Sequence, residues 1–191
     1  MKTYMFRMAT AQDAAAILSI YAPYIRQTPI TFEYEVPTLE EFTERVRCIL
    51  RNYPYIVCEQ AGEIIGYGYA SAYHERAAYQ WDADLSIYFA PEATGHGLGR
   101  QMLCKLVEIL RLQGVRNVYS CVTFPNPPSE QMHEALGFRT VGRFHQAGFK
   151  CGSWHDVTWF EKQIAPCDGH PEPFRSIQSI PTVQIMEILT R

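Results

Sequence analysis

The sequence predicts a mixed α/β fold, and three observations support this prediction. Two capping boxes, Thr10 with Asp13 and Thr38 with Glu41, mark the starts of two helices early in the chain. Short runs rich in β-branched and aromatic residues follow, and 61–63 joins two of them as a hairpin turn. Later in the chain, an apolar stripe with helical spacing stands between further strand-like runs.

In the first half of the chain, the elements follow from local patterns. A helix is expected from Thr10 toward Tyr24, and a second one runs from Thr38 until 52–54 ends it. The apolar residues of the second helix recur every three to four positions, which places them on one face: Phe42, Val46, Ile49 and Leu50. The strands expected here are 3–8, 55–60, 64–73 and 83–89.

In the second half, Leu98 begins a helical stripe that ends before Gly114, a natural C-terminal cap residue. A buried strand at 117–122, a short helix at 129–136 and strand-like runs to about residue 163 complete the sheet. From Ala165 onward, four prolines and few large hydrophobic residues predict an irregular tail, although 183–189 could pack back. We therefore expect a domain at 1–164 and a tail at 165–191.

Composition narrows the classes of partner. At 191 residues and 47% hydrophobic content the chain can bury the core of one globular domain, and a net charge of -3 does not favour nucleic acid or an anionic membrane. The cysteines show neither a Cys-x-x-Cys pair nor zinc-ligand spacing, so no metal is expected. With no leader or membrane-spanning run in the sequence, we expect a cytoplasmic protein.

The turn Thr94-Gly95-His96-Gly97-Leu98-Gly99 lies between an expected strand and an expected helix. Glycines before a helix start leave backbone N–H groups free, and with the helix dipole these bind phosphate oxygens. The spacing differs from the dinucleotide fingerprint, and no Lys-Ser or Lys-Thr pair follows. On glycine content alone, a tight turn and helix cap without a ligand is the more common outcome.

With its neighbours, the turn resembles the cofactor loop of the GNAT superfamily of N-acetyltransferases. That loop reads Gln/Arg-x-x-Gly-x-Gly/Ala and is followed by Asn-x-x-Ala/Ser; here the matching residues are Thr94, Gly97, Gly99, Asn126 and Ser129. The resemblance implies an acetyl-coenzyme A (acetyl-CoA)-dependent enzyme, whose central, mostly antiparallel sheet is flanked by helices. The family's Gln or Arg is replaced by a threonine, so backbone amides of Gly95 to Arg100 would carry the phosphate contact.

Several blocks further resemble the phosphinothricin and methionine sulfoximine acetyltransferases of this superfamily. They are Thr31-Phe32-Glu33, Ala78-Tyr79-Gln80-Trp81, Ser86-Ile87-Tyr88-Phe89-Ala90-Pro91, Met132-His133-Glu134-Ala135-Leu136-Gly137-Phe138, and Gly148-Phe149-Lys150-Cys151-Gly152-Ser153-Trp154-His155-Asp156-Val157. This resemblance implies direct acetyl transfer to the amine of a small amino-acid-like acceptor, such as phosphinothricin, methionine sulfoximine or methionine sulfone. It also implies a homodimer.

The resemblance also suggests catalytic and binding residues. His133 occupies the position where many GNAT members have a tyrosine that protonates the leaving thiolate, and an imidazole can take or return a proton there. Asp84 lies where relatives place a glutamate proposed to act as base or to position the amine; a solvent-facing strand aspartate is the alternative. Backbone groups of Ile87, Tyr88 and Phe89 can pair with the cofactor's pantetheine amides, unless a neighbouring strand uses them.

For the acceptor, Arg76 is the expected carboxylate ligand, because a guanidinium grips two oxygens at once. The family has a second basic residue two positions earlier, where this chain has the weaker, titratable His74. Phe32 is the aromatic residue best placed beside the acceptor, although aromatic residues are more often core. Two other functions stay open: acetylation of protein or peptide amines, and coenzyme A binding without catalysis.

Overall fold

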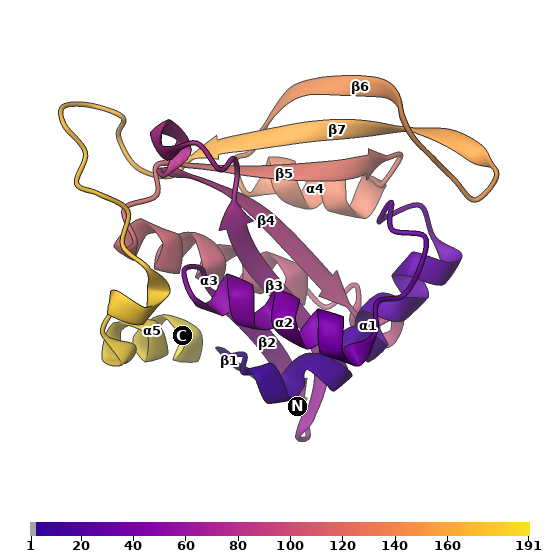
Figure 1. Ribbon diagram of the computed structural model, residues 1–191, viewed down its shortest axis with the longest axis horizontal. Helices are drawn as coiled ribbons and strands as arrows, with labels where there is room; N and C mark the ends of the chain where they lie inside the picture. The colour runs from indigo at the N-terminus through magenta and orange to yellow at the C-terminus, as the bar shows by residue number, and fades with distance from the viewer. Residues whose placement is uncertain (1–2) are drawn as a thin grey trace.

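The computed structural model describes residues 3–191 and has the mixed α/β architecture that the sequence predicts (Figure 1). Within these residues, seven strands form one sheet: β1 (Tyr4–Met8), β2 (Tyr55–Gln60), β3 (Glu63–Ala72), β4 (Asp82–Phe89), β5 (Asn117–Phe124), β6 (Arg139–Lys150) and β7 (Ser153–Gln163). The same part of the chain holds five α-helices: α1 (Ala14–Gln27), α2 (Leu39–Leu50), α3 (Leu98–Leu112), α4 (Pro127–Ala135) and α5 (Thr182–Thr190).

The strand order is β1-β2-β3-β4-β5-β7-β6, and neighbouring strands are antiparallel except β4 and β5, which run parallel. Helices α1 and α2 cover one face of β2 to β4, and α3 covers the opposite face (Figure 1). We call these the α1 face and the α3 face. The mostly antiparallel sheet with flanking helices is therefore confirmed.

Strands β4 and β5 pair only where both begin. The register joins Asp82 with Asn117 and, as the last pair between these strands within residues 3–191, Asp84 with Tyr119. Beyond this pair β4 continues against β3, and β5 continues against β7. The sheet thus splits into two halves, and a gap between their edges leads toward the C-terminal end of β4 (Figure 1).

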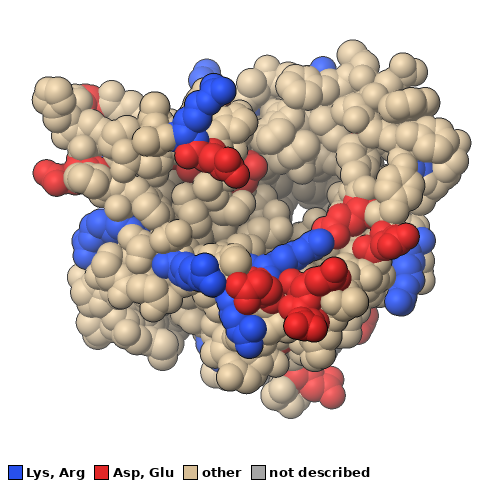
Figure 2. Space-filling view, viewed as in Figure 1, with Lys and Arg blue, Asp and Glu red and all other residues tan. Residues whose placement is uncertain are grey.

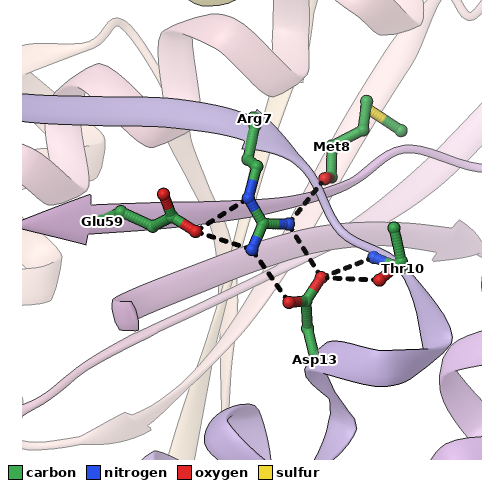
Figure 3. A network of polar contacts seen from close by, with 5 residues as sticks. All are labelled: Arg7, Met8, Thr10, Asp13 and Glu59. Atoms are coloured by element: carbon green, nitrogen blue, oxygen red, sulfur yellow. Dashed lines mark hydrogen bonds and ion pairs between the residues drawn. The ribbon is translucent and has the colours of Figure 1, made fainter. Parts of the chain in front are cut away.

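The capping boxes at Thr10 and Thr38 are both confirmed. At the first one, the Asp13 carboxylate accepts from the Thr10 backbone N–H at 2.7 Å and from the Arg7 guanidinium at 2.8 Å (Figure 3). Arg7 also donates to Glu59 of β2, so its charge joins two strands to the start of the first helical segment. The adjacent guanidinium lowers the pKa of Asp13.

The main core lies on the α3 face. The apolar stripe of α3 is buried against the sheet, as its spacing predicts: Leu98, Met102, Leu103, Leu106, Val107 and Leu110. The short helix α4 begins at Pro127, two residues before the expected start, because a proline fits the first turn of a helix. No helix in residues 3–191 combines the length and apolar character needed to cross a membrane.

The last part of the tail is the segment that the sequence allowed to pack back onto the domain, and it does so as a helix. Residues 165–176 form no helix or strand, as expected, and Thr182–Thr190 form α5. Its residues Ile185, Ile188 and Leu189 are buried in the main core beside β1 and α3. Pro181 at the N-cap offers no capping side chain, so burial, and not a local start signal, accounts for this helix.

Candidate active site

The glycine turn lies at the C-terminal end of β4, where the gap between the two halves of the sheet opens. Gly95 and Gly97 have φ values of 79° and 74°, in the left-handed region that glycine adopts without strain. Gly97 is the N-cap of α3 and has no side chain to cap the helix, so the first N–H groups of α3 keep their hydrogen-bonding capacity. Thr94, His96 and Arg100 are exposed beside them.

The Thr94 side chain is engaged within the turn itself. Its hydroxyl donates to the Pro91 carbonyl at 2.7 Å. Threonine therefore stabilises the turn and does not reach outward as the family's longer Gln or Arg can. The backbone amides and the exposed Arg100 are left as the groups of the turn whose chemistry suits a phosphate.

Helix α4 packs close to the start of α3. A Cβ atom on Gly99 would lie 3.2 Å from the Met132 sulfur, so the missing side chain permits this approach. Asn126 is the N-cap of α4, and its backbone N–H donates to the Glu130 carboxylate at 2.7 Å. The Asn126 and Ser129 segment thus stands beside the glycine turn, where the resemblance places it near the cofactor.

The backbone groups of Ile87 and Phe89 in β4 face away from β3, toward the gap. Those of Tyr88 face β3, because the Ala90 N–H donates to the Ile65 carbonyl and backbone groups alternate along a strand. The Phe89 carbonyl accepts a hydrogen bond from the Tyr24 hydroxyl at 2.6 Å, which leaves this oxygen one further lone pair. The Tyr88 ring packs against Tyr24 with centroids 5.2 Å apart. From Asp84 to Phe89 the strand spans about 17 Å, a length that an extended pantetheine arm covers.

Asp84 lies at the fork of the sheet and is largely withdrawn from water. Its Oδ1 atom is buried and has no hydrogen-bond partner among residues 3–191. Burial raises the pKa of this carboxyl to about 6, since no cation offsets the lost hydration. A buried carboxylate with an unused oxygen can bind an ammonium group or accept a proton near neutral pH. The alternative of a solvent-facing aspartate does not describe this residue.

His133 is buried on α4, with 5% of its surface exposed. Its Nδ1 lies 2.8 Å from the Ser129 carbonyl oxygen; because a carbonyl only accepts, Nδ1 carries the proton and Nε2 keeps a lone pair. The ring stacks on Phe160 with centroids 5.0 Å apart, and burial lowers the pKa of the imidazole. The neutral form, with Nε2 as a proton acceptor, is therefore favoured.

Asp84 and His133 face opposite sides of the sheet. Asp84 pairs with Tyr119, whereas Phe160, against which His133 packs, pairs with Ser120, the next residue of β5. Since side chains alternate along a strand, the carboxylate lies on the α1 face and the imidazole on the α3 face. The structure thus does not bring the two into contact, and the gap between β4 and β5 separates them.

His74 and Arg76 lie in the loop between β3 and β4, and both are exposed. His74 packs on Tyr73 with ring centroids 4.2 Å apart, and Tyr73 in turn stacks on Tyr119 at 4.3 Å. This stack connects the loop to the strand position that pairs with Asp84. Arg76 has no ion pair with any residue in 3–191, so its guanidinium is available to a ligand.

Phe32 lies in the segment between α1 and α2, which crosses to the hairpin of β6 and β7. Its ring packs on Gly148, where an added Cβ atom would come within 2.3 Å of it. The buried Lys150 ammonium donates to the Thr31 carbonyl at 2.5 Å, and the Tyr34 hydroxyl donates to the Phe149 carbonyl. These contacts fasten the segment across one end of the gap.

We call residues 28–38 the strap. No local sequence pattern predicts the contact between Lys150 and Thr31, because 119 positions separate them. Figure 2, in the same view as Figure 1, shows the surface hollowed between the two halves of the molecule. The strap bounds this hollow, and charged side chains gather along its lower rim, over α2.

Two tryptophans from the blocks that resemble the family contact other parts of the chain. The Trp81 indole N–H donates to the Glu172 carbonyl at 2.8 Å, so this ring binds the tail segment. Trp154 is 60% exposed on the β6–β7 hairpin, where it packs on Phe149. Among residues 3–191, no group of three His, Cys, Asp or Glu side chains has an arrangement that could hold a metal ion.

Comparison with known proteins agrees with this geometry. Residues 6–159 match the acetyltransferase (GNAT) domain. The phosphinothricin N-acetyltransferase of Streptomyces viridochromogenes is 32% identical over 91% of this chain and 94% of its own length. The L-methionine sulfoximine/L-methionine sulfone acetyltransferase of Salmonella typhimurium is 29% identical over 87% of this chain and 96% of its own length.

A solved structure gives the same result. The crystal structure of a GNAT superfamily phosphinothricin acetyltransferase from Sinorhizobium meliloti, in complex with acetyl-CoA, has a TM-score of 0.86 and 34% identity. The match covers 89% of this chain and 94% of that one. The free amides of the glycine turn and the split sheet fit acetyl-CoA as cosubstrate. This chain therefore belongs to the GNAT superfamily and is an acetyl-CoA-dependent N-acetyltransferase.

Proposed function

We propose that the enzyme transfers the acetyl group directly from acetyl-CoA to the α-amine of a small amino-acid-like acceptor. The observation that carries this proposal is the buried, unpartnered Oδ1 of Asp84 at the fork of the sheet. An ammonium group would satisfy that oxygen. The relatives named for phosphinothricin, methionine sulfoximine and methionine sulfone support acceptors of this type.

In this proposal Asp84 takes the proton from the acceptor's ammonium group. The neutral amine then attacks the thioester carbonyl, a C–N bond forms, and the C–S bond breaks with its electron pair on sulfur. The nitrogen loses its second proton, and the thiolate gains one. His133 lies on the side of the sheet where α3 and α4 form the proposed cofactor site. Its Nε2 accepts the second proton from the nitrogen and passes it to the thiolate. The proton on Asp84 returns to solvent.

Acceptor binding is assigned to residues around the same hollow. Arg76 binds the acceptor's carboxylate, and its exposure without an ion pair supports this role. His74 adds a hydrogen bond or, when protonated, a second charge. Phe32, which the strap holds against Gly148, covers the acceptor.

We also propose that two copies of the chain associate. The β6–β7 hairpin exposes four large apolar side chains: Val141, Phe144, Phe149 and Trp154. Exposed apolar surface is a common feature of protein interfaces. Size-exclusion chromatography with light scattering is expected to give a dimer that Phe144→Glu shifts toward the monomer. A monomeric wild-type protein would contradict this part of the proposal.

The test of the proposed function is thiol release from acetyl-CoA with a panel of amines. Methionine sulfone, methionine sulfoximine, phosphinothricin and the common amino acids are compared with a peptide bearing a free amino terminus. We expect turnover with at least one amino-acid-like acceptor and its loss in Asp84→Asn. Turnover of the peptide alone, or acetyl-CoA binding without any turnover, would overturn the assignment.

A further inference from the structure

The loop between β3 and β4 carries Arg76 at the start of a single 3₁₀ turn, Ala77–Tyr79. Arg76 is the N-cap of this turn, and its carbonyl accepts from the Tyr79 N–H at 2.9 Å. Within residues 3–191, no hydrogen bond or ion pair links 74–79 directly to the rest of the chain except to Gln80. Since one 3₁₀ turn has weak internal hydrogen bonds, the direction of Arg76 depends on what holds the ends of the loop.

Gln80 joins this turn to the tail. Its side-chain Nε2 donates to the Ala77 carbonyl at 3.2 Å, and its Oε1 accepts from the Phe174 backbone N–H at 3.2 Å. The next side chain, Trp81, donates its indole N–H to the Glu172 carbonyl at 2.8 Å. Two neighbouring side chains at the end of the loop therefore bind the same short piece of the tail, and one of them also binds the residue that follows Arg76.

The tail is itself fixed at this point, on its way from the end of β7 to α5 (Figure 1). Gln113, fully buried at the end of α3, exchanges two hydrogen bonds with Arg175. Its Nε2 donates to the Arg175 carbonyl at 2.8 Å, and its own carbonyl accepts from the Arg175 N–H at 2.9 Å. The Phe174 ring packs on Tyr53 with centroids 5.0 Å apart. This piece of the tail is thus fastened to the core and can hold the loop in place.

We infer that the tail is part of the acceptor site: residues 172–175 hold the loop between β3 and β4 through Gln80 and Trp81. Gln80 is the positioning residue, because it connects this support to the turn that Arg76 begins. The inference rests on the proposed function, which makes Arg76 the ligand of the acceptor's carboxylate. A loop that is ordered before binding loses less conformational entropy when the acceptor binds, so the support lowers the KM for the acceptor. The tail follows the matched domain, residues 6–159, and adds to its site from outside.

The double variant Gln80→Leu/Trp81→Phe removes both side-chain bonds to the tail and keeps apolar groups of similar size. We expect the KM for methionine sulfone to rise about tenfold or more, and the KM for acetyl-CoA to stay within about twofold. Gln178→Leu is the matched control, because this tail glutamine donates to the Leu50 carbonyl at 2.7 Å, away from the loop. It should change neither constant. An unchanged KM for methionine sulfone in the double variant, or an equal rise in both KM values, would overturn the inference.

A combination with Arg76→Gln shows whether the tail acts through Arg76. Arg76→Gln alone should raise the KM for methionine sulfone about tenfold or more. Adding the double variant to it should change this KM less than about twofold, because the positioned residue is already missing. A further tenfold rise on the Arg76→Gln background would refute the positioning role.

An acceptor without a carboxylate provides a second readout. 3-(Methylsulfonyl)propylamine is methionine sulfone without its carboxylate, so it has no group for Arg76 to bind. The double variant should acetylate this amine with a kcat/KM within about twofold of wild type. A loss as large as that with methionine sulfone would mean that the tail only stabilises the fold, and would overturn the inference.

Calorimetric binding of methionine sulfone to the coenzyme A-saturated protein separates this inference from the proposed function. If Arg76→Gln weakens binding and the double variant does not, the positioning role fails and the proposed acceptor site stands. If the double variant weakens binding about tenfold only where Arg76 is present, and no acceptor is turned over, the inference stands and the proposed chemistry fails. If the wild-type protein does not bind methionine sulfone, or Arg76→Gln binds it equally well, the carboxylate assignment and the inference both fail.

Discussion

Asp84 and Tyr119 form the last pair between β4 and β5 before the two strands separate. The pairing places the carboxylate at the fork of the sheet, where the gap begins. The glycine turn lies at the other end of the same strand, so one short element connects the proposed base with the proposed cofactor site. In the proposed function, this arrangement lets an amine on one face meet a thioester in the gap.

Asp84→Asn should stabilise the protein at high pH. The pKa of Asp84 in the folded protein, about 6, exceeds the ordinary value of 3.8, so the folded state holds this proton more tightly. The protonated carboxyl therefore adds to the free energy of unfolding below about pH 4. This contribution is lost as the pH rises through 6. The variant lacks this ionisation. We expect it to be about 1–2 kcal/mol more stable than wild type at pH 8 and no more stable at pH 4.

Denaturant unfolding at several pH values measures this difference. Asp82→Asn on the same strand provides the control, because that carboxylate already accepts from the Asn117 amide. A stability difference for Asp84→Asn that does not change between pH 4 and pH 8 would contradict the burial argument.

His133→Phe tests the imidazole separately from its packing. The phenyl ring retains the stacking on Phe160 but removes Nδ1 and Nε2. If Nε2 relays the thiolate's proton, kcat should fall about a hundredfold or more while the KM for acetyl-CoA stays near the wild-type value. Unchanged kcat in steady-state assays would mean that this histidine only fills the core.

Gly97→Ala tests the glycine turn. Nothing lies within 4 Å of an added Cβ atom, so its effect comes from the φ value of 74° and not from a clash. We expect a loss of about 1 kcal/mol in stability and weaker acetyl-CoA binding in calorimetry. Gly142→Ala, also without close neighbours but outside the left-handed region, should leave both unchanged. Unaltered acetyl-CoA affinity in Gly97→Ala would show that the turn does not shape the phosphate site.

Gly148→Ala tests the strap. The new methyl group would meet the Phe32 ring and displace it. We expect the KM for the acceptor to rise about tenfold or more while the KM for acetyl-CoA stays constant. Gly142→Ala again serves as control. Equal changes in both constants would indicate a general loss of structure instead of a local effect on the acceptor.

The sequence predicts those features whose causes are local. Thr38 and Glu41 cap α2 as expected, since a capping box needs residues only three positions apart. Glycines in a turn likewise indicate positive φ values, and Gly97 has a φ value of 74°. The helix α5 had no such start signal, because its stability comes from contacts with β1 and α3 that lie far away in sequence.

The same distinction between local and long-range causes applies to the residues of the site. Asp84 could be proposed by resemblance, but its buried and unpartnered oxygen depends on the surrounding fold. Lys150 stands in a block that the sequence analysis singled out, yet its bond to Thr31 requires the strap to cross the gap.

The most direct test of the account is the pH dependence of kcat/KM for wild type and Asp84→Asn with the same acceptor. Dividing one profile by the other cancels the ionisation of the acceptor's own amine. If Asp84 is the base, the ratio should rise with pH and level off above about pH 6, where the wild-type enzyme is about a hundredfold or more faster. A ratio near one at every pH would contradict the central claim that Asp84 takes the proton.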